Sequence, residues 1–430
     1  MRRPTQVICC AVSALLLTLL TGAVRVPTGK VPEPPPSTPA ERVDTAVQAG
    51  VAFLVTQQQA SGAIADVGLG NRYQTALTSL AALSFIGAGH SPQDKTPEGV
   101  ALRRAIYFVL RADRQTADGY FGSADASVMH GHAVTTLLLC ELLRRSTDPE
   151  LEELIRRKAA AAHQFTLRAQ GARKLLRTDY GGWRYRPDAT DSDVPVTAWQ
   201  LLSLHAGTKA GFAVPPVAGQ AAAQYLKNVH AAAYGVFDYG PKPVVTQAWR
   251  TSVVGRKLVS RTPYYNPRAG RVCYTCHYEG GTNVVNYFPP QTRPPDTILQ
   301  PATERNHFST SAMGLLGLRL CGQPNAPEAV AAAAFLLETM RADPTMRVLA
   351  NGSWPFHAAF FNTLAFQRYA EPHASLARQF AERNFVVGQS PDGSWTDNFE
   401  GRNLGRVYCT SLAVLSLEAK YRRLAIYEPP

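Results

Sequence analysis

The stretch from Gly181 to Leu204 constrains the fold more than any other part of the chain, because shorter copies of it recur along the sequence. It consists of a Gly-Gly-Trp turn, a loop with two aspartates, and a segment whose small and apolar residues alternate at helical spacing. Pro195 suits the first turn of that helix, where its missing N–H is not needed, and Asp193 can cap the free backbone donors. The pattern predicts an acidic loop that leads into one buried helix.

Five other helix starts align with this one and set the period of a repeat. Thr135 lies 60 residues after Thr75, and Thr197 lies 62 residues after Thr135. The next step, from Thr197 to Thr310, is 113 residues long and indicates an insertion. The aligned segments are Tyr73–Leu77, His132–Thr136, Val196–Gln200, Ser309–Met313, His357–Phe361 and Tyr408–Leu412.

A second helical segment precedes each of these, and several end in Gln or Gly followed by a turn. Examples are the turns at Gln58–Gly62 and Asp392–Trp395. A helix pair of this length cannot bury its apolar face alone, so neighbouring pairs must stack. The sequence therefore predicts a repeat architecture of six helix pairs.

These turns carry a family resemblance. Gly-Ser-Trp and Gly-Gly-Trp turns ahead of small-residue helices, together with the terminal Leu424–Pro429 segment, resemble the terpenoid cyclase and prenyltransferase superfamily. The resemblance extends to squalene-hopene cyclase repeats and to secreted proteins with prenyltransferase and squalene oxidase repeats, and it covers about Asp44 to Tyr427. It implies an all-α fold, an α/α toroid of six inner and six outer helices, with a long irregular insertion before the fourth inner helix. One fold hosts many functions, so the activity must be argued from the site.

The N-terminal region predicts export. Residues 1–23 place Arg2 and Arg3 before an apolar run that ends at Thr21-Gly22-Ala23, which is typical of a signal peptide. The alternative is an uncleaved N-terminal membrane anchor. Residues 24–43 form a Pro-rich linker, and residues 44–430 form the toroid, with its insertion at 239–307. We expect a periplasmic or secreted protein.

The chain is basic, with 44 Lys and Arg against 32 Asp and Glu, a net charge of +12. Removal of Arg2 and Arg3 would leave 42 basic residues and a charge of +10. This charge suits a solvated outer face, or contact with an anionic envelope surface. Basic residues without interleaved aromatic residues argue against nucleic acid as a partner. The sequence does not fix an oligomeric state.

Asp191 and Asp193 are the candidate catalytic residues that the resemblance implies. In the cyclases an Asp-rich motif at the matching place protonates a polyprene, which requires a carboxyl that stays neutral in an apolar cavity. Here Val194 stands where the motif has its last aspartate. Asp193 is also explained as a helix cap. If the protein is an enzyme, the resemblance implies a terpene cyclase-like or isomerase-like activity, and the leading hypothesis includes a degenerate terpene cyclase.

Aromatic and histidine side chains near the inner-helix starts are the candidate ligand-binding residues. They are expected to surround an apolar, isoprenoid-like ligand in the central cavity of the toroid. His130 and His132 also suit a metal site or a proton-transfer role, or plain packing at a helix start. The candidates are Trp183, Trp199, His130, His132 and Tyr408.

The insertion contains Cys273-Tyr274-Thr275-Cys276-His277, the C-x-x-C-H pattern of covalent c-type haem attachment. Cys273, Cys276 and His277 also suit a zinc site, and the two cysteines suit a redox or structural disulfide. The sequence thus leaves three functions open. The leading one is an exported toroid that binds an isoprenoid-like ligand; the others are a haem-bearing redox module and a non-catalytic scaffold that binds the cell envelope.

Overall fold

The computed structural model describes residues 38–145, 148–231, 235–239, 258–266, 271–278, 281–287, 301–344, 354–367 and 369–428, with side chains except at 258–287 and 301–307. The predicted signal peptide and most of the linker lie outside these residues. The body from Pro39 to Pro430 is one compact unit. Its first helix begins at Pro39, within the segment predicted as linker.

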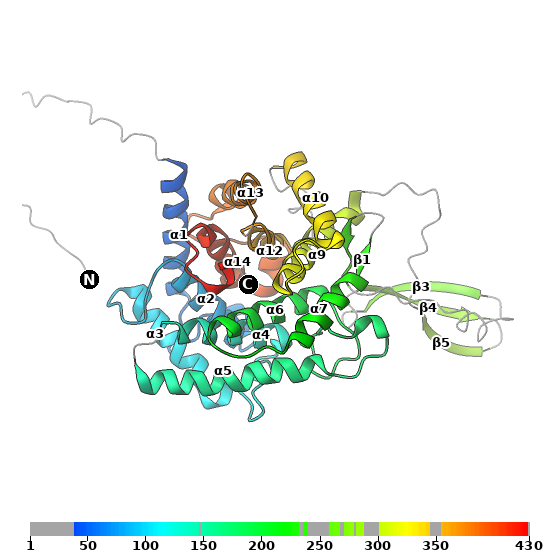
Figure 1. Ribbon diagram of the computed structural model, residues 1–430, viewed down its shortest axis with the longest axis horizontal. Coiled ribbons are helices and arrows are strands. Elements are labelled where there is room, and N and C mark those ends of the chain that lie inside the picture. Colours follow the sequence, from blue (N-terminus) through cyan, green and yellow to red (C-terminus); the bar gives the residue numbers. More distant parts are fainter. Residues whose placement is uncertain are drawn as a thin grey trace, which may run out of the picture. The chain divides into compact units, whose positions relative to one another are not determined.

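Six helices of the described part contact one another in a closed ring, and each touches the next one in the order of the chain until the last returns to the first. This arrangement confirms the predicted all-α toroid (Figure 1). The ring helices are α2 (Gln74–Gly87), α4 (Val128–Leu143), α6 (Val194–Lys209), α9 (Pro301–Leu320), α12 (Pro355–Phe366) and α14 (Glu400–Glu418).

The remaining long helices surround the ring, and each packs against one or more of the inner helices. Five of the six begin with proline at the first or second helical position, where a missing N–H costs no hydrogen bond. Their buried residues form one stripe, whereas α12 is buried at all twelve positions. The outer helices are α1 (Pro39–Thr56), α3 (Pro97–Leu110), α5 (Pro149–Gln170), α7 (Pro216–Asn228), α10 (Pro327–Ala342) and α13 (His373–Gly388).

A glutamine at or just after the end of an outer helix clamps each of four turns to the next outer helix. Gln170 Nε2 donates to the carbonyl of Gly181 at 2.8 Å and to that of Ala218, on α7, at 2.9 Å. Gln389 makes the same pair of bonds to Gly393 and to Ala46, on α1, and so joins the last repeat to the first. The four glutamine clamps are Gln58, Gln115, Gln170 and Gln389.

The turn glycines pack against the same helices. Gly181 has a φ of +94°, and a Cβ there would lie 2.0 Å from the carbonyl oxygen of Ala221. Gly393 has a φ of +86°, and its Cβ would lie 2.2 Å from the Ala49 oxygen. Each position therefore demands glycine twice, for its left-handed backbone and for the close approach of a neighbouring helix. This accounts for the repeated Gly-Gly-Trp and Gly-Ser-Trp turns.

Strands occur in two places in the described chain. Strands β1 (His230–Ala231) and β2 (Val236–Phe237) pair antiparallel. Strands β3 (Leu258–Asn266), β4 (Arg271–Tyr278) and β5 (Gly281–Tyr287) form an antiparallel sheet in the order β3-β4-β5. The insertion predicted as irregular thus contains a sheet, and α9 begins at Pro301 rather than after 307. The segment is rich in Tyr, Val and Thr, which suit strands.

The C-terminal segment packs across the opposite ends of the inner helices. Ala425 donates its N–H to the buried carboxylate of Glu141, which also pairs with Arg145. The hydroxyl of Tyr427 donates to the carbonyl of Leu415 at 2.7 Å. The short 3₁₀ helices are η1 (Val67–Leu69), η2 (Ala112–Arg114), η3 (Arg177–Asp179), η4 (Ala419–Tyr421) and η5 (Ala425–Tyr427). None of the described helices combines the length and apolarity that a membrane span requires.

Exchange of Gly181 for alanine should destabilise the fold more than exchange of Gly211. Both glycines have a φ near +90°, but a Cβ added at Gly211 would have no atom within 4 Å, whereas one added at Gly181 would meet the Ala221 carbonyl. Gly211→Ala should lower the free energy of unfolding by about 1 kcal/mol through backbone strain, and Gly181→Ala should lower it by about 2 kcal/mol more. Urea unfolding of the mature chain measures both, and equal losses would show that the close approach has no energetic weight.

Candidate functional site

The N-terminal ends of the inner helices are tied together by the loops that precede their neighbours. The carboxylate of Asp125, just before α4, accepts the N–H of Thr75 on α2 at 2.6 Å. Glu400, at the start of α14, accepts the N–H groups of Phe356 and His357 on α12 at 2.6 and 3.2 Å. Five such contacts place these helix ends on one side of the ring. The residues that accept these N–H groups are Asp66, Asp125, Tyr185, Tyr239 and Glu400.

Asp193 lies at this end, fully buried, with both carboxylate oxygens engaged. Its Oδ1 caps α6 by accepting the N–H of Val196 at 2.7 Å. Its Oδ2 pairs with Arg184 at 3.1 Å and accepts the hydroxyl of Tyr239 at 3.1 Å. Asp191 has a half-exposed side chain and lies 3.5 Å from Arg184 Nε. The structure thus brings the two predicted catalytic residues to one guanidinium.

This geometry favours a structural role for Asp193 over alkene protonation. Burial raises the pKa of Asp193 to about 6, although Arg184 and the Val196 N–H oppose that rise. Ion pairing and accepted hydrogen bonds both stabilise the carboxylate form. Both carboxylate oxygens are thus already engaged by protein donors. The capping interpretation of Asp193 agrees with its contacts.

Trp199 and three aromatic side chains from α12 fill part of the ring. Trp199 Nε1 donates to His357 Nε2 at 3.0 Å, and its ring stacks on Phe360 and meets Phe361 edge-on. Because α6 and α12 are separated in the ring by α9, these contacts cross its interior. Trp199 is 3% exposed and His357 is 6% exposed. Side chains therefore occupy space that the predicted central cavity would need.

Trp183 and His132 pack toward the outer helices. Trp183 Nε1 donates to the carbonyl of Thr166 on α5, and its indole is 1% exposed. His132 is fully buried and its Nε2 lies 3.0 Å from the Thr166 hydroxyl. Neither side chain leaves surface for a ligand. Both side chains pack between the two helix layers, and their role in ligand binding stays a prediction.

His130 points elsewhere than His132. Its ring lies 5.4 Å from that of Tyr185, on the loop before α6. No three His, Cys, Asp or Glu side chains in the described part of the chain are placed to hold a metal ion. Thus the two histidines diverge, and the metal interpretation of this pair gains no support. His130 and Tyr185 instead border the inner-helix ends.

A group of aromatic side chains stays partly exposed at this end, and we call it the aromatic rim. Trp354 and Phe399 are 38% and 41% exposed and meet edge to face at 5.2 Å. Tyr239 is 41% exposed, and its hydroxyl is hydrogen-bonded to that of Tyr185. Burial raises the pKa of the Tyr408 hydroxyl well above its usual range. The rim comprises Tyr73, Tyr185, Tyr239, Trp354, Phe399 and Tyr408.

Of the rim residues, only Tyr408 was among the predicted ligand-binding residues. Trp354 and Phe399 fall in turns just before inner helices, where aromatic residues look like turn packing. Arg184, which lies 4.8 Å from the Tyr185 ring, was also missed. The signal that could have found it is its position between a Gly-Gly-Trp turn and two aspartates, since a cation there can pair with both.

The C-x-x-C-H motif lies in β4, where the backbone is described and the side chains are not. Positions 273 and 276 pair with Tyr264 and Arg261 of β3. The three interpretations of Cys273, Cys276 and His277 stay predictions.

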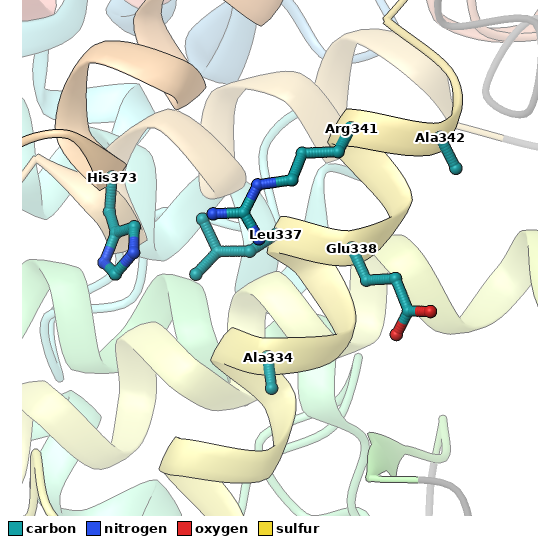
Figure 2. Close-up of a pocket in the computed structure, with 6 residues that line it drawn as sticks. All are labelled: Ala334, Leu337, Glu338, Arg341, Ala342 and His373. Atoms are coloured by element: carbon teal, nitrogen blue, oxygen red, sulfur yellow. The ribbon is translucent and has the colours of Figure 1, made fainter.

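An open groove of about 630 Å³ lies between the outer helices α10 and α13. In Figure 2 the Arg341 side chain extends toward His373, while Glu338 points away from it. The groove wall also includes Ala334 and Leu337. None of the predicted site residues lines it, so this groove is separate from the inner-helix ends.

Comparisons with known proteins agree on the fold alone. No protein-family model and no curated protein matches the chain. The GH76A alpha-1,6-mannanase from Salegentibacter sp. HEL1_6 matches with a TM-score of 0.50 and 10% identity, over 90% of this chain and 100% of that one. The type II terpene cyclase MstE from Scytonema, in complex with geranylgeranyl dihydroxybenzoate, matches with a TM-score of 0.48 and 13% identity, over 90% and 99%. The mannanase likeness shows a shared helical toroid.

Acidification below pH 6.5 should destabilise the protein. Burial lowers the pKa of His132 to about 3 in the folded chain, whereas an unfolded histidine titrates near 6.5. The unfolded state therefore binds the proton first, and stability is lost as pH falls from 6.5 toward 3. The loss at pH 5.5 should be about 1 kcal/mol for this residue.

Urea unfolding at pH 7.5 and 5.5 tests this expectation. His132→Gln should reduce the difference between the two pH values. The matched control is His373→Gln, because His373 is partly exposed in the groove of Figure 2. A pH dependence that His132→Gln leaves unchanged would contradict the assignment.

Proposed function

We propose that the protein binds an apolar, prenyl-like ligand at the aromatic rim and does not cyclise it. The observation that carries the proposal is the partial exposure of Trp354, Phe399 and Tyr239 at one end of the ring. Covering a large aromatic side chain with hydrocarbon removes apolar surface from water and so lowers the free energy of the complex. The resemblance of the Gly-Trp turns to terpenoid cyclase repeats supports the same ligand class.

The charges around Tyr185 and Tyr239 favour a ligand without a strongly anionic head group. Arg184 lies 4.8 and 5.3 Å from their ring centres. Its guanidinium is already matched by Asp191 and Asp193. Burial lowers the pKa of His130 to about 4, so its ring is neutral at pH 7. A prenyl alcohol or hydrocarbon suits this environment better than a prenyl diphosphate.

The ligand would lie over the inner-helix ends, because aromatic side chains fill the ring below them. Trp199, His357 and Phe361 contact one another across the interior. This arrangement supports a surface or shallow mode of binding in place of the deep cavity that was predicted. We further propose that the protein acts outside the cytoplasm, in keeping with the signal pattern at residues 1–23.

Loss of a rim aromatic should weaken binding of geranylgeraniol. Phe399→Ala removes a side chain that is 41% exposed and touches Trp354. Deletion of such a contact is expected to cost about 1 to 2 kcal/mol, or about tenfold in Kd. The matched control is Tyr421→Ala, because Tyr421 is 43% exposed and lies past the other end of α14.

Isothermal titration of the mature chain with geranylgeraniol measures these changes. Trp354→Ala should reproduce the effect of Phe399→Ala, and Tyr421→Ala should bind as the wild type does. Equal affinities of all four proteins, or no binding by the wild type, would rule out the rim as the binding site.

Incubation with squalene or geranylgeraniol should return the ligand unchanged, because Asp193 is held as a paired carboxylate. Gas chromatography with mass detection compares the wild type with Asp193→Asn and with a protein-free sample. A cyclised product made by the wild type and lost in Asp193→Asn would instead make Asp193 a general acid.

A further inference from the structure

A polar cavity of about 310 Å³ lies between the first two repeats, apart from the aromatic rim. Its wall combines the turn after α1, the start of α2, the end of α3 and the η2 turn. Its lining includes Gln59, Asn71, Gln74, Phe108, Arg111 and Arg114. This volume is at the small end of ligand pockets and suits a molecule of monosaccharide size.

Three carboxamides line one side of the cavity and bond to one another only weakly. Gln74 Nε2 lies 3.3 Å from Gln59 Oε1 and 3.5 Å from Asn71 Oδ1. Amide hydrogen bonds are usually 2.7 to about 3.2 Å long. Each carboxamide offers both donors and an acceptor, which is the combination that recognises hydroxyl groups. This side of the cavity therefore suits a hydroxylated ligand.

Two arginines also line the cavity and share one acid. Arg111 and Arg114 lie 5.7 and 5.1 Å from the centre of the Phe108 ring. Both pair with Asp113, which leaves a net charge of +1. Asp113 bonds to one terminal nitrogen of each guanidinium, and an anion in the cavity can bind to the second terminal nitrogen of each.

We propose that this cavity binds a hydroxylated anion of monosaccharide size, a sugar acid or a sugar phosphate. Arg114 and Arg111 receive the carboxylate or phosphate group, because a guanidinium matches the geometry of both. Gln59, Asn71 and Gln74 receive the hydroxyl groups. The site is independent of the aromatic rim and takes a ligand of opposite polarity.

Isothermal titration of the mature chain with glucuronate, glucose 6-phosphate, glucose and inorganic phosphate tests the proposal. At least one anionic sugar should bind with a Kd below about 1 mM, and glucose and inorganic phosphate should each bind at least about tenfold more weakly. Preference between glucuronate and glucose 6-phosphate identifies the source of the charge. Either preference supports the proposal.

Variants separate the two halves of the cavity. Arg114→Ala should weaken binding about tenfold or more, and Arg114→Lys should weaken it less, because lysine keeps the charge and loses the fork. Gln74→Ala should weaken binding of the sugar but not of inorganic phosphate. The matched control is Arg173→Ala, because Arg173 lies outside the cavity wall. This exchange should leave the Kd of the anionic sugar unchanged.

Three results would overturn the proposal. Neither anionic sugar binds at 10 mM, which is about ten times the expected upper limit of Kd. Inorganic phosphate binds as tightly as glucose 6-phosphate, which would make the cavity a simple anion site. Arg114→Ala and Arg114→Lys both bind as the wild type does, which would place the ligand elsewhere.

Discussion

A carboxamide that donates to two backbone carbonyls is the interaction on which the ring depends. At Gln170 the bonds run to the turn of its own repeat and to the outer helix of the next repeat. The turn glycine packs against that same helix, so the clamp and the glycine fix one another's position. Because Gln389 reaches Ala46 in the same way, the last repeat is joined to the first. A linear array would leave these end groups unpaired.

The ring closure has a consequence for the candidate site. Asp125 and Glu400 use their carboxylates to accept N–H groups from the helix of the preceding repeat. Asp193 caps its own helix and pairs with Arg184. The carboxylates of Asp125, Asp193 and Glu400 thus hold the helix ends in place. Aromatic side chains stay partly exposed there, and this is why we propose binding rather than acid catalysis.

Much of the architecture could be predicted from the sequence, because the repeat is local. Thr75 and Thr197 fall in the first turn of α2 and α6, whereas α4 begins at Val128, about two turns before Thr135. Pro97 and Pro149 begin outer helices, because proline suits the first helical position, where its missing N–H is not needed. The strands of the insertion were not predicted, because strand pairing depends on partners that are distant along the chain.

The candidate site was harder to predict, because it depends on which side of a helix faces which neighbour. His130 and His132 are two residues apart, yet one borders the rim and the other is buried against α5. Trp199 was expected to line a central cavity, whereas its indole packs against side chains of α12 in the interior of the ring. Trp354 and Phe399 come from two neighbouring repeats and meet only when these pack side by side. Such contacts across repeats leave no periodic signal.

The most direct test of the account is photo-crosslinking of the mature chain with a diazirine-bearing prenyl alcohol, followed by peptide mass spectrometry. We predict that the label falls on the aromatic rim, at residues such as Trp354, Phe399 and Tyr239, and that excess geranylgeraniol prevents labelling. Label that falls only on the outer helices or on the inner face around Trp199 would contradict it.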